Sequence, residues 1–171
     1  MPRDTILFDI NETVLDLSSL KPKFKAAFGM KVLPQPDFQC FLHTLTVCIL
    51  TGIKSNFADL AGIMLDTIAA RTGVGLPEVK RADILSGFAS LPPHADIKPA
   101  LSRLRSAGYR TVAFSNSSLN LITTQIKNAG LTDYFDDIVS AEETGSFNAS
   151  PCALNTRYYL NRTLCSHKCY N

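Results

Sequence analysis

The stretch that decides the fold is TILFDINET, residues 5–13. An apolar run leads to a carboxylate at Asp9, and the chain then turns polar. A bounded apolar run of this length is typical of a strand that is buried on both faces of a parallel sheet. Asp9 would stand at the carboxyl end of that strand, where open α/β sheets bind their ligands. The stretch therefore predicts an aspartate that acts either as a nucleophile or as a cap of the following turn.

The composition is that of a globular chain with one hydrophobic core. The chain has 171 residues, of which 46% are hydrophobic, a mean hydropathy of +0.08 and a formal net charge of +2. A charge balance this close to neutral indicates neither a nucleic-acid partner nor a membrane surface. No stretch approaches the roughly 20 apolar residues of a membrane span, and no basic-then-apolar signal opens the chain, so we expect a cytoplasmic protein.

Cysteine usage agrees with a reducing compartment. The cysteines are odd in number and do not have the spacing of metal ligands, which predicts free thiols. We accordingly expect neither a metal nor another cofactor. The cysteines are Cys40, Cys48, Cys152, Cys165 and Cys169.

The middle of the chain is predicted to be helical. Apolar residues recur there at helical spacing, and glycines and prolines interrupt the pattern without any strand signal. The predicted helices cover residues 21–28, about 38–49, 57–72 and 77–88.

The period changes after Leu91-Pro92-Pro93. A helix capped by Asp96, a strand, a helix capped by Ser118 and a short strand follow one another. Alternation of this kind is typical of right-handed parallel crossovers. The helical stretch before it would then form a second, small domain over the strand ends. The two later strands are predicted at residues 111–114 and 137–140.

Several motifs carry a family resemblance that covers residues 4 to about 147. FDINETVLD, residues 8–16, resembles the first motif of the haloacid dehalogenase superfamily, in which an aspartate nucleophile is followed four residues later by threonine. FSNS, residues 114–117, resembles the second motif, at the end of the next strand. LPP at 91–93, AGY at 107–109 and AGLTDYFD at 129–136 resemble the type II branch, the L-2-haloacid dehalogenases.

The resemblance implies an α/β fold with a Rossmann-like parallel core and an inserted helical cap domain. The core would comprise residues 1–15 and 93–147, and the cap residues 16–92, while an atypical tail would cover 148–171 and leave the core incomplete at its C-terminal end. Asp9 would be the nucleophile and Thr13 would orient it. Ser115 and Asn116 would hold the substrate carboxylate or the aspartate oxygens.

The residue two positions after the nucleophile separates two branches of the superfamily. The phosphatases resemble one another in a second aspartate there, which protonates the leaving alkoxide. This chain has Asn11, which cannot do so, whereas a halide leaves without a proton. Asn11 therefore favours a dehalogenase, in which it would border the substrate. The alternative is that Asn11 only shapes the turn through its side-chain hydrogen bonds.

Two features depart from the type II pattern. That branch has a cap arginine that gathers the substrate, but no arginine occurs here between Arg3 and Arg71, and Lys31 is the nearest substitute. The family's lysine after the third strand is also missing, because Asn148-Ala149 stands there. Residues 148–171 contain no acidic residue, which indicates either a shifted reading frame or a genuine divergent tail. His43 is expected to be a packed or surface histidine rather than a base.

The sequence thus predicts a hydrolase that displaces halide from a small 2-haloacid through an aspartyl ester, with weakened turnover. The alternatives are a non-catalytic remnant or binding protein that retains the fold and, third, a small-molecule phosphatase that would need Mg²⁺. The expected partner is a small-molecule substrate, with no nucleic acid and no membrane, and a homodimer is left open. Because a carboxylate at a buried strand end loses solvation, we expect a raised pKa for Asp9.

Overall fold

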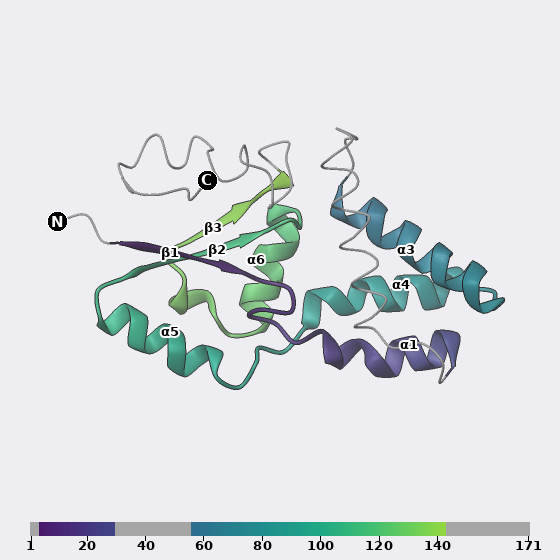
Figure 1. Ribbon diagram of the computed structural model, residues 1–171, viewed down its shortest axis with the longest axis horizontal. Helices are drawn as coiled ribbons and strands as arrows, with labels where there is room; N and C mark the ends of the chain where they lie inside the picture. The colour runs from purple at the N-terminus through teal and green to yellow at the C-terminus, as the bar shows by residue number, and fades with distance from the viewer. Residues whose placement is uncertain (1–3, 30–55, 143–171) are drawn as a thin grey trace, which may run out of the picture.

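The computed structural model of the protein describes residues 4–29 and 56–142. Its centre is a parallel three-stranded sheet with the order β1-β2-β3, which confirms the predicted α/β fold (Figure 1). All three predicted strands are present. They are β1 (Thr5–Asp9), β2 (Arg110–Ser115) and β3 (Asp137–Ser140).

The strands differ in burial. β2 is buried along almost its whole length, since it pairs with β1 on one side and β3 on the other. The apolar run of β1 by itself favours burial on both faces, whereas a core that is incomplete at its C-terminal end leaves β1 at an edge. Among the described residues the second expectation is confirmed and the first is wrong, because residues 5–8 are only half-buried and Asp9 is exposed. Within the described part of the chain, β1 pairs with β2 alone and so forms an edge of the sheet. Its Phe8 ring packs edge-on against Phe135, with ring centroids 6.0 Å apart.

Two crossover helices connect the strands, α5 (Ile97–Ser106) and α6 (Leu119–Asn128). α5 packs against β2, and α6 packs against β3. Ser118 caps α6 as predicted, its hydroxyl accepting from the Leu121 amide at 3.4 Å. Asp96 stands at the N-cap of α5, but its side chain makes no capping hydrogen bond, because the backbone there is already helical. Leu119, in the first turn of α6, is 37% exposed.

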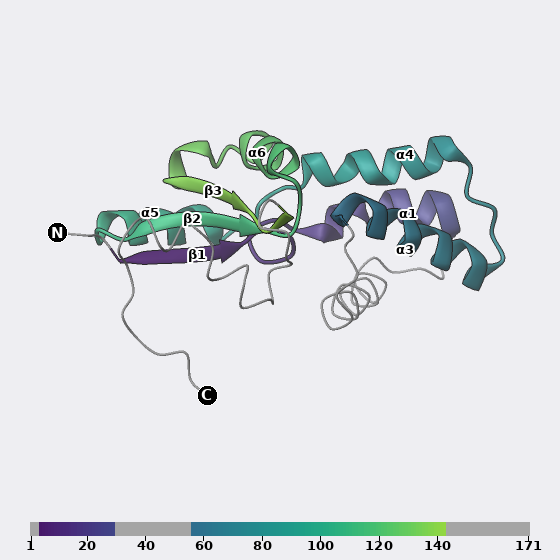
Figure 2. The same ribbon diagram turned by 90° about the horizontal axis from the view of Figure 1, so that it is seen from above.

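Between β1 and α5 the described residues 17–29 and 56–90 form a helical segment that lies beyond the carboxyl ends of the strands (Figures 1 and 2). Asn56 caps α3 as predicted, accepting from the Asp59 amide at 2.7 Å, and Gly73 ends it with φ +68°. Gly87 allows α4 to pack closely against Leu20, the residue just before α1. A Cβ at position 87 would lie 2.6 Å from Leu20 Cδ2. The predicted helix over residues 38–49 lies outside the described residues. The segment contains η1 (Leu17–Leu20), α1 (Lys21–Phe28), α3 (Phe57–Thr72), α4 (Glu78–Gly87) and η2 (Phe88–Ser90).

Two linkers join the helical segment to the sheet, and they pair with each other. The Asp16 amide donates to the Pro92 carbonyl at 2.8 Å, and the His94 amide donates to the Val14 carbonyl at 3.0 Å. Leu15 and Pro93 form an antiparallel bridge between these two bonds. The outgoing linker (residues 10–16) and the return linker (residues 91–96) are therefore hydrogen-bonded side by side.

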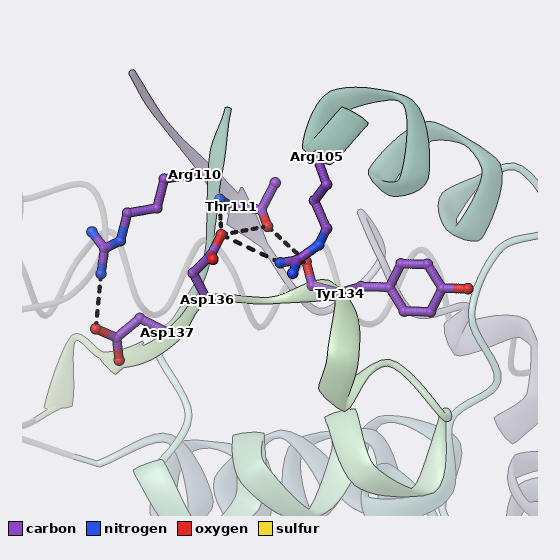
Figure 3. A network of polar contacts seen from close by, with 6 residues as sticks. All are labelled: Arg105, Arg110, Thr111, Tyr134, Asp136 and Asp137. Atoms are coloured by element: carbon purple, nitrogen blue, oxygen red, sulfur yellow. Dashed lines mark hydrogen bonds and ion pairs between the residues drawn. The ribbon is translucent and has the colours of Figure 1, made fainter. Parts of the chain in front are cut away.

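A polar network fixes β2 and β3 at their amino ends (Figure 3). Asp136 accepts from the Thr111 amide at 2.9 Å and pairs with Arg105 at 3.4 Å. The Thr111 hydroxyl donates to the Tyr134 carbonyl at 2.6 Å. These bonds hold the turn before β3 against the first residues of β2, which sets the register of the two strands.

In the described ranges, no helix combines the length and the apolar character that crossing a membrane requires.

Replacing Asp136 with alanine should lower the free energy of unfolding by about 1–3 kcal/mol, because the Thr111 amide and the Arg105 guanidinium lose their shared acceptor. Urea unfolding followed by circular dichroism measures this loss. The control is Asp133→Ala, an exposed position in the same turn, where we expect a change within about 0.5 kcal/mol. Equal losses in the two variants would contradict the role given to the network.

Candidate active site

Asp9 ends β1, and the turn that follows brings Thr13 back to it. The amides of Val14 and Leu15 both donate to the Ile10 carbonyl, at 3.0 and 2.9 Å, and this closes the turn. The Thr13 hydroxyl donates to Asp9 Oδ2 at 3.2 Å. The four-residue spacing seen in the sequence thus becomes a contact between the two side chains.

The environment of Asp9 raises the pKa of its carboxyl. Loss of hydration is the largest cause, and the hydrogen bonds from Thr13 and from the Ile10 backbone oppose it. The residue as a whole is exposed, so the carboxylate is accessible even though neighbouring atoms displace part of its water. The raised pKa expected from the sequence is confirmed in direction.

The second motif lies beside the first because of strand register. Asp9 is paired with Phe114, the residue before Ser115. Both motifs therefore lie at the carboxyl ends of neighbouring parallel strands. Ser115 is buried, and its hydroxyl accepts from the Ser117 amide at 3.3 Å. Asn116 is half-buried next to it. The end of β3 holds this loop, since the Ser140 hydroxyl donates to the Ser117 carbonyl at 2.7 Å.

Asn11 is buried, and its side-chain amide hydrogen-bonds the first motif to the second. It donates to the Ser117 hydroxyl at 3.2 Å and accepts from Gln125 Nε2 at 3.0 Å. Both ends of the Asn11 side chain are therefore engaged within the protein. This arrangement supports the turn-shaping alternative, and a contact of Asn11 with substrate stays a prediction.

Gln125 was not identified from the sequence. It is fully buried in α6, where its Nε2 also donates to the Phe88 carbonyl at 2.8 Å. Its Oε1 is buried without a hydrogen-bond partner. Its place in the sequence could have indicated a buried polar residue. Gln125 stands three residues after Ile122 and next to Ile126, on the apolar stripe of its helix.

Glu12 was missed as well, and it lies in a cluster outside the Asp9 site. Its backbone has φ +67°, the one left-handed non-glycine conformation among the described residues. Ligand atoms of Glu12, Asp16 and His94 all lie within 4.8 Å of one another. Hydrogen bonds from the Ser18 hydroxyl and amide hold the pKa of Asp16 below its usual value. The sequence predicted no metal site, and this group is the set of described residues that could hold an ion.

Two predicted residues lie outside the described part of the chain. Lys31, the expected substitute for the cap arginine, and His43, the expected packed histidine, both fall within residues 30–55. Their roles stay predictions.

A model of the haloacid dehalogenase-like hydrolases matches residues 3–156. The chain belongs to this family. It is 30% identical over 104 residues to (S)-2-haloacid dehalogenase 2 of Pseudomonas sp. strain CBS-3, a match covering 61% of this chain and 45% of the relative. It is 29% identical over 151 residues to the (S)-2-haloacid dehalogenase of Xanthobacter autotrophicus, covering 85% of this chain and 58% of that enzyme. These relatives agree with the type II branch that the motifs indicated.

Solved structures share the fold. The L-2-haloacid dehalogenase of Xanthobacter autotrophicus with chloropropionic acid covalently bound superimposes with a TM-score of 0.79 at 23% identity, covering 90% of this chain and 62% of that one. The L-2-haloacid dehalogenase RSc1362 superimposes with a TM-score of 0.83 at 22% identity, covering 93% and 74%. The chain spans about half the length of the curated relatives it matches.

The raised pKa of Asp9 makes stability depend on pH with a definite sign. The folded carboxyl holds its proton to higher pH than the unfolded one, so its contribution to stability is full below the unfolded pKa and is lost as pH rises through the folded pKa. Asp9→Asn cannot ionise and should therefore gain stability relative to wild type as pH rises from about 4, the unfolded value, towards neutral.

Urea unfolding of the wild type and Asp9→Asn across that pH range measures this difference. Asp133→Asn is the control for removing one exposed carboxylate elsewhere. A stability difference between Asp9→Asn and wild type that stays constant with pH would contradict the raised pKa.

Proposed function

We propose that this chain is a hydrolase that removes halide from a small 2-haloacid, with Asp9 as the nucleophile. The observation that supports this most is the pair Asp9–Thr13 at the end of β1, in register with the Ser115 loop of β2. The names of the curated relatives point the same way. The desolvation that raises the pKa of Asp9 also leaves a carboxylate that is poorly hydrated, which favours attack on carbon once it is ionised.

The proposed reaction has two steps. An Asp9 carboxylate oxygen forms a bond to the carbon that bears the halogen, and the carbon–halogen bond breaks with its electron pair, so halide leaves. Water then attacks the carbonyl carbon of the resulting aspartyl ester, which releases the 2-hydroxyacid and a proton and restores the carboxylate. A displacement by the carboxylate followed by ester hydrolysis thus replaces one difficult displacement by water.

The neighbouring residues have positioning roles in this proposal. Thr13 holds one oxygen of Asp9 through its hydrogen bond and so directs the other towards the substrate. Ser115 and Asn116 border the substrate carboxylate, and Lys31 supplies positive charge. Asn11 keeps the Ser117 loop in place beneath them.

The helical segment is proposed to act as a cap. Residues 16–92 would form this cap domain over a core of residues 1–15 and 93–147, with residues 148–171 as a separate tail. The position of the helices beyond the carboxyl ends of the strands supports this division, because Asp9 ends β1 on that side (Figure 2). Closure of such a cap would exclude bulk water from the displacement step.

The setting and the assembly are part of the proposal. We expect a small-molecule substrate, in line with the relatives' names, and a cytoplasmic location, in line with the cysteine spacing that predicts free thiols. A homodimer would be seen as twice the chain mass in sedimentation equilibrium.

Halide release from 2-chloropropionate tests the nucleophile. Wild type should release chloride in the presence of a chelator, and Asp9→Ala should lose at least about 10³-fold in rate. Because Asn148 stands at the position of the family's lysine, we expect wild-type turnover about 10²- to 10³-fold below that of a relative such as the Xanthobacter enzyme, assayed in parallel. Asp133→Ala is the control and should keep the wild-type rate.

Isotope incorporation then tests the ester. After turnover in ¹⁸O-water, solvent oxygen should appear in the Asp9 carboxyl, read by peptide mass spectrometry. Label found only in the product would mean direct attack by water and would overturn the nucleophile assignment. Phosphate-ester hydrolysis that requires Mg²⁺, without halide release, would replace this proposal with the phosphatase.

A further inference from the structure

Three potential metal ligands converge where the two linkers meet. Glu12 and Asp16 belong to the outgoing linker, and His94 belongs to the return linker. One ligand atom from each lies within 4.8 Å of the other two. The imidazole and the carboxylates are far apart in the sequence, so the pairing of the linkers is what brings them together.

The backbone holds the three residues in place. The Asp16 amide bonds to Pro92, two residues before His94, and the His94 amide bonds to Val14, two residues before Asp16. The pairing is therefore nearly symmetric about the cluster, and each linker positions the ligand of the other. Such support of a ligand set by surrounding hydrogen bonds is a common feature of metal sites.

The two carboxylates are oriented by hydrogen bonds of their own. Asp16 accepts from the Ser18 amide at 2.7 Å and from the Ser18 hydroxyl at 2.6 Å. Glu12 Oε2 accepts from the Leu17 amide at 3.1 Å. Within residues 4–29 and 56–142, neither carboxylate forms an ion pair with lysine or arginine. The negative charge of the cluster is thus available to a cation.

The donor set selects a class of ion. One imidazole nitrogen with two carboxylate oxygens suits Zn²⁺ and Co²⁺, whereas Mg²⁺ and Ca²⁺ prefer oxygen ligands alone. Tetrahedral zinc with bonds of roughly 2.0–2.1 Å places its ligand atoms about 3.4 Å apart. Atoms that lie within 4.8 Å of one another are at most about 1.4 Å further apart than this, a difference that rotation of the exposed Glu12 and half-buried His94 side chains can close.

We propose that Glu12, Asp16 and His94 form a binding site for a divalent transition-metal ion that joins the outgoing and return linkers. Three protein ligands leave one position of a tetrahedral ion for water. Asp9 is not among its ligands, and the ion takes no part in halide displacement. Its effect is on the linkers, since an ion bound to both resists their separation.

Titration of the full chain with Co²⁺ tests the site. Wild type should bind one ion there, seen as visible d–d absorption without the near-ultraviolet thiolate charge-transfer band that cysteine ligation would produce. His94→Ala and Glu12→Gln should each weaken that binding by at least about tenfold. Glu12→Gln keeps an acceptor for the Leu17 amide, so it tests the ligand without removing the local hydrogen bond. His43→Ala is the matched control and should bind as wild type does.

Amide exchange supplies a second readout. The ion should slow exchange of the Asp16 and His94 amides, which join the linkers, in wild type and not in Glu12→Gln. Absence of binding to wild type, or equal binding by wild type and both ligand variants, would overturn the site. The halide-release assay contains chelator, so its outcome is independent of this one.

Discussion

The register between β1 and β2 is the constraint on which the site depends. Pairing of Asp9 with Phe114 places the end of the first strand one residue from Ser115. Because side chains alternate along a strand, a slip of one residue would turn the apolar side chains of β1 to the opposite face and move Asp9 away from the Ser115 loop. The Thr111–Asp136 and Ser140–Ser117 bonds extend the same alignment to β3.

The segments between the strands could be predicted where a local rule decides the structure. Lys21–Phe28 has a proline in its first turn and ends at glycine, and Asn56 and Ser118 cap their helices through their own side chains. The Asp9–Thr13 contact was also foreseeable, since both residues lie in one turn. In each case the interacting groups are a few residues apart, so sequence spacing carries the geometry.

Other features could not be predicted because distant segments create them. The half-buried state of β1 depends on its place at the sheet edge, which follows from the expected incomplete core and not from the apolar residues of β1 themselves. Asp96 makes no capping bond because the backbone before α5 is already helical. His94 approaches Glu12 through linkers that are paired only in the folded chain. Gln125 lies in an apolar stripe of its helix, and its partners Asn11 and Phe88 come from segments that are distant in the sequence.

Gln125 hydrogen-bonds both to the turn that follows β1 and to the end of the helical segment. Its single amide nitrogen donates both to Asn11, under the Asp9 turn, and to the Phe88 carbonyl, where the helical segment ends. Each amide hydrogen serves one acceptor, and a buried acceptor that loses its donor is destabilised. Movement of η2 away from α6 therefore removes one bond and frees the side chain that holds Asn11. Asn11 in turn holds Ser117, so the loop after β2 depends on contacts made by the end of the helical segment as well as on the strands.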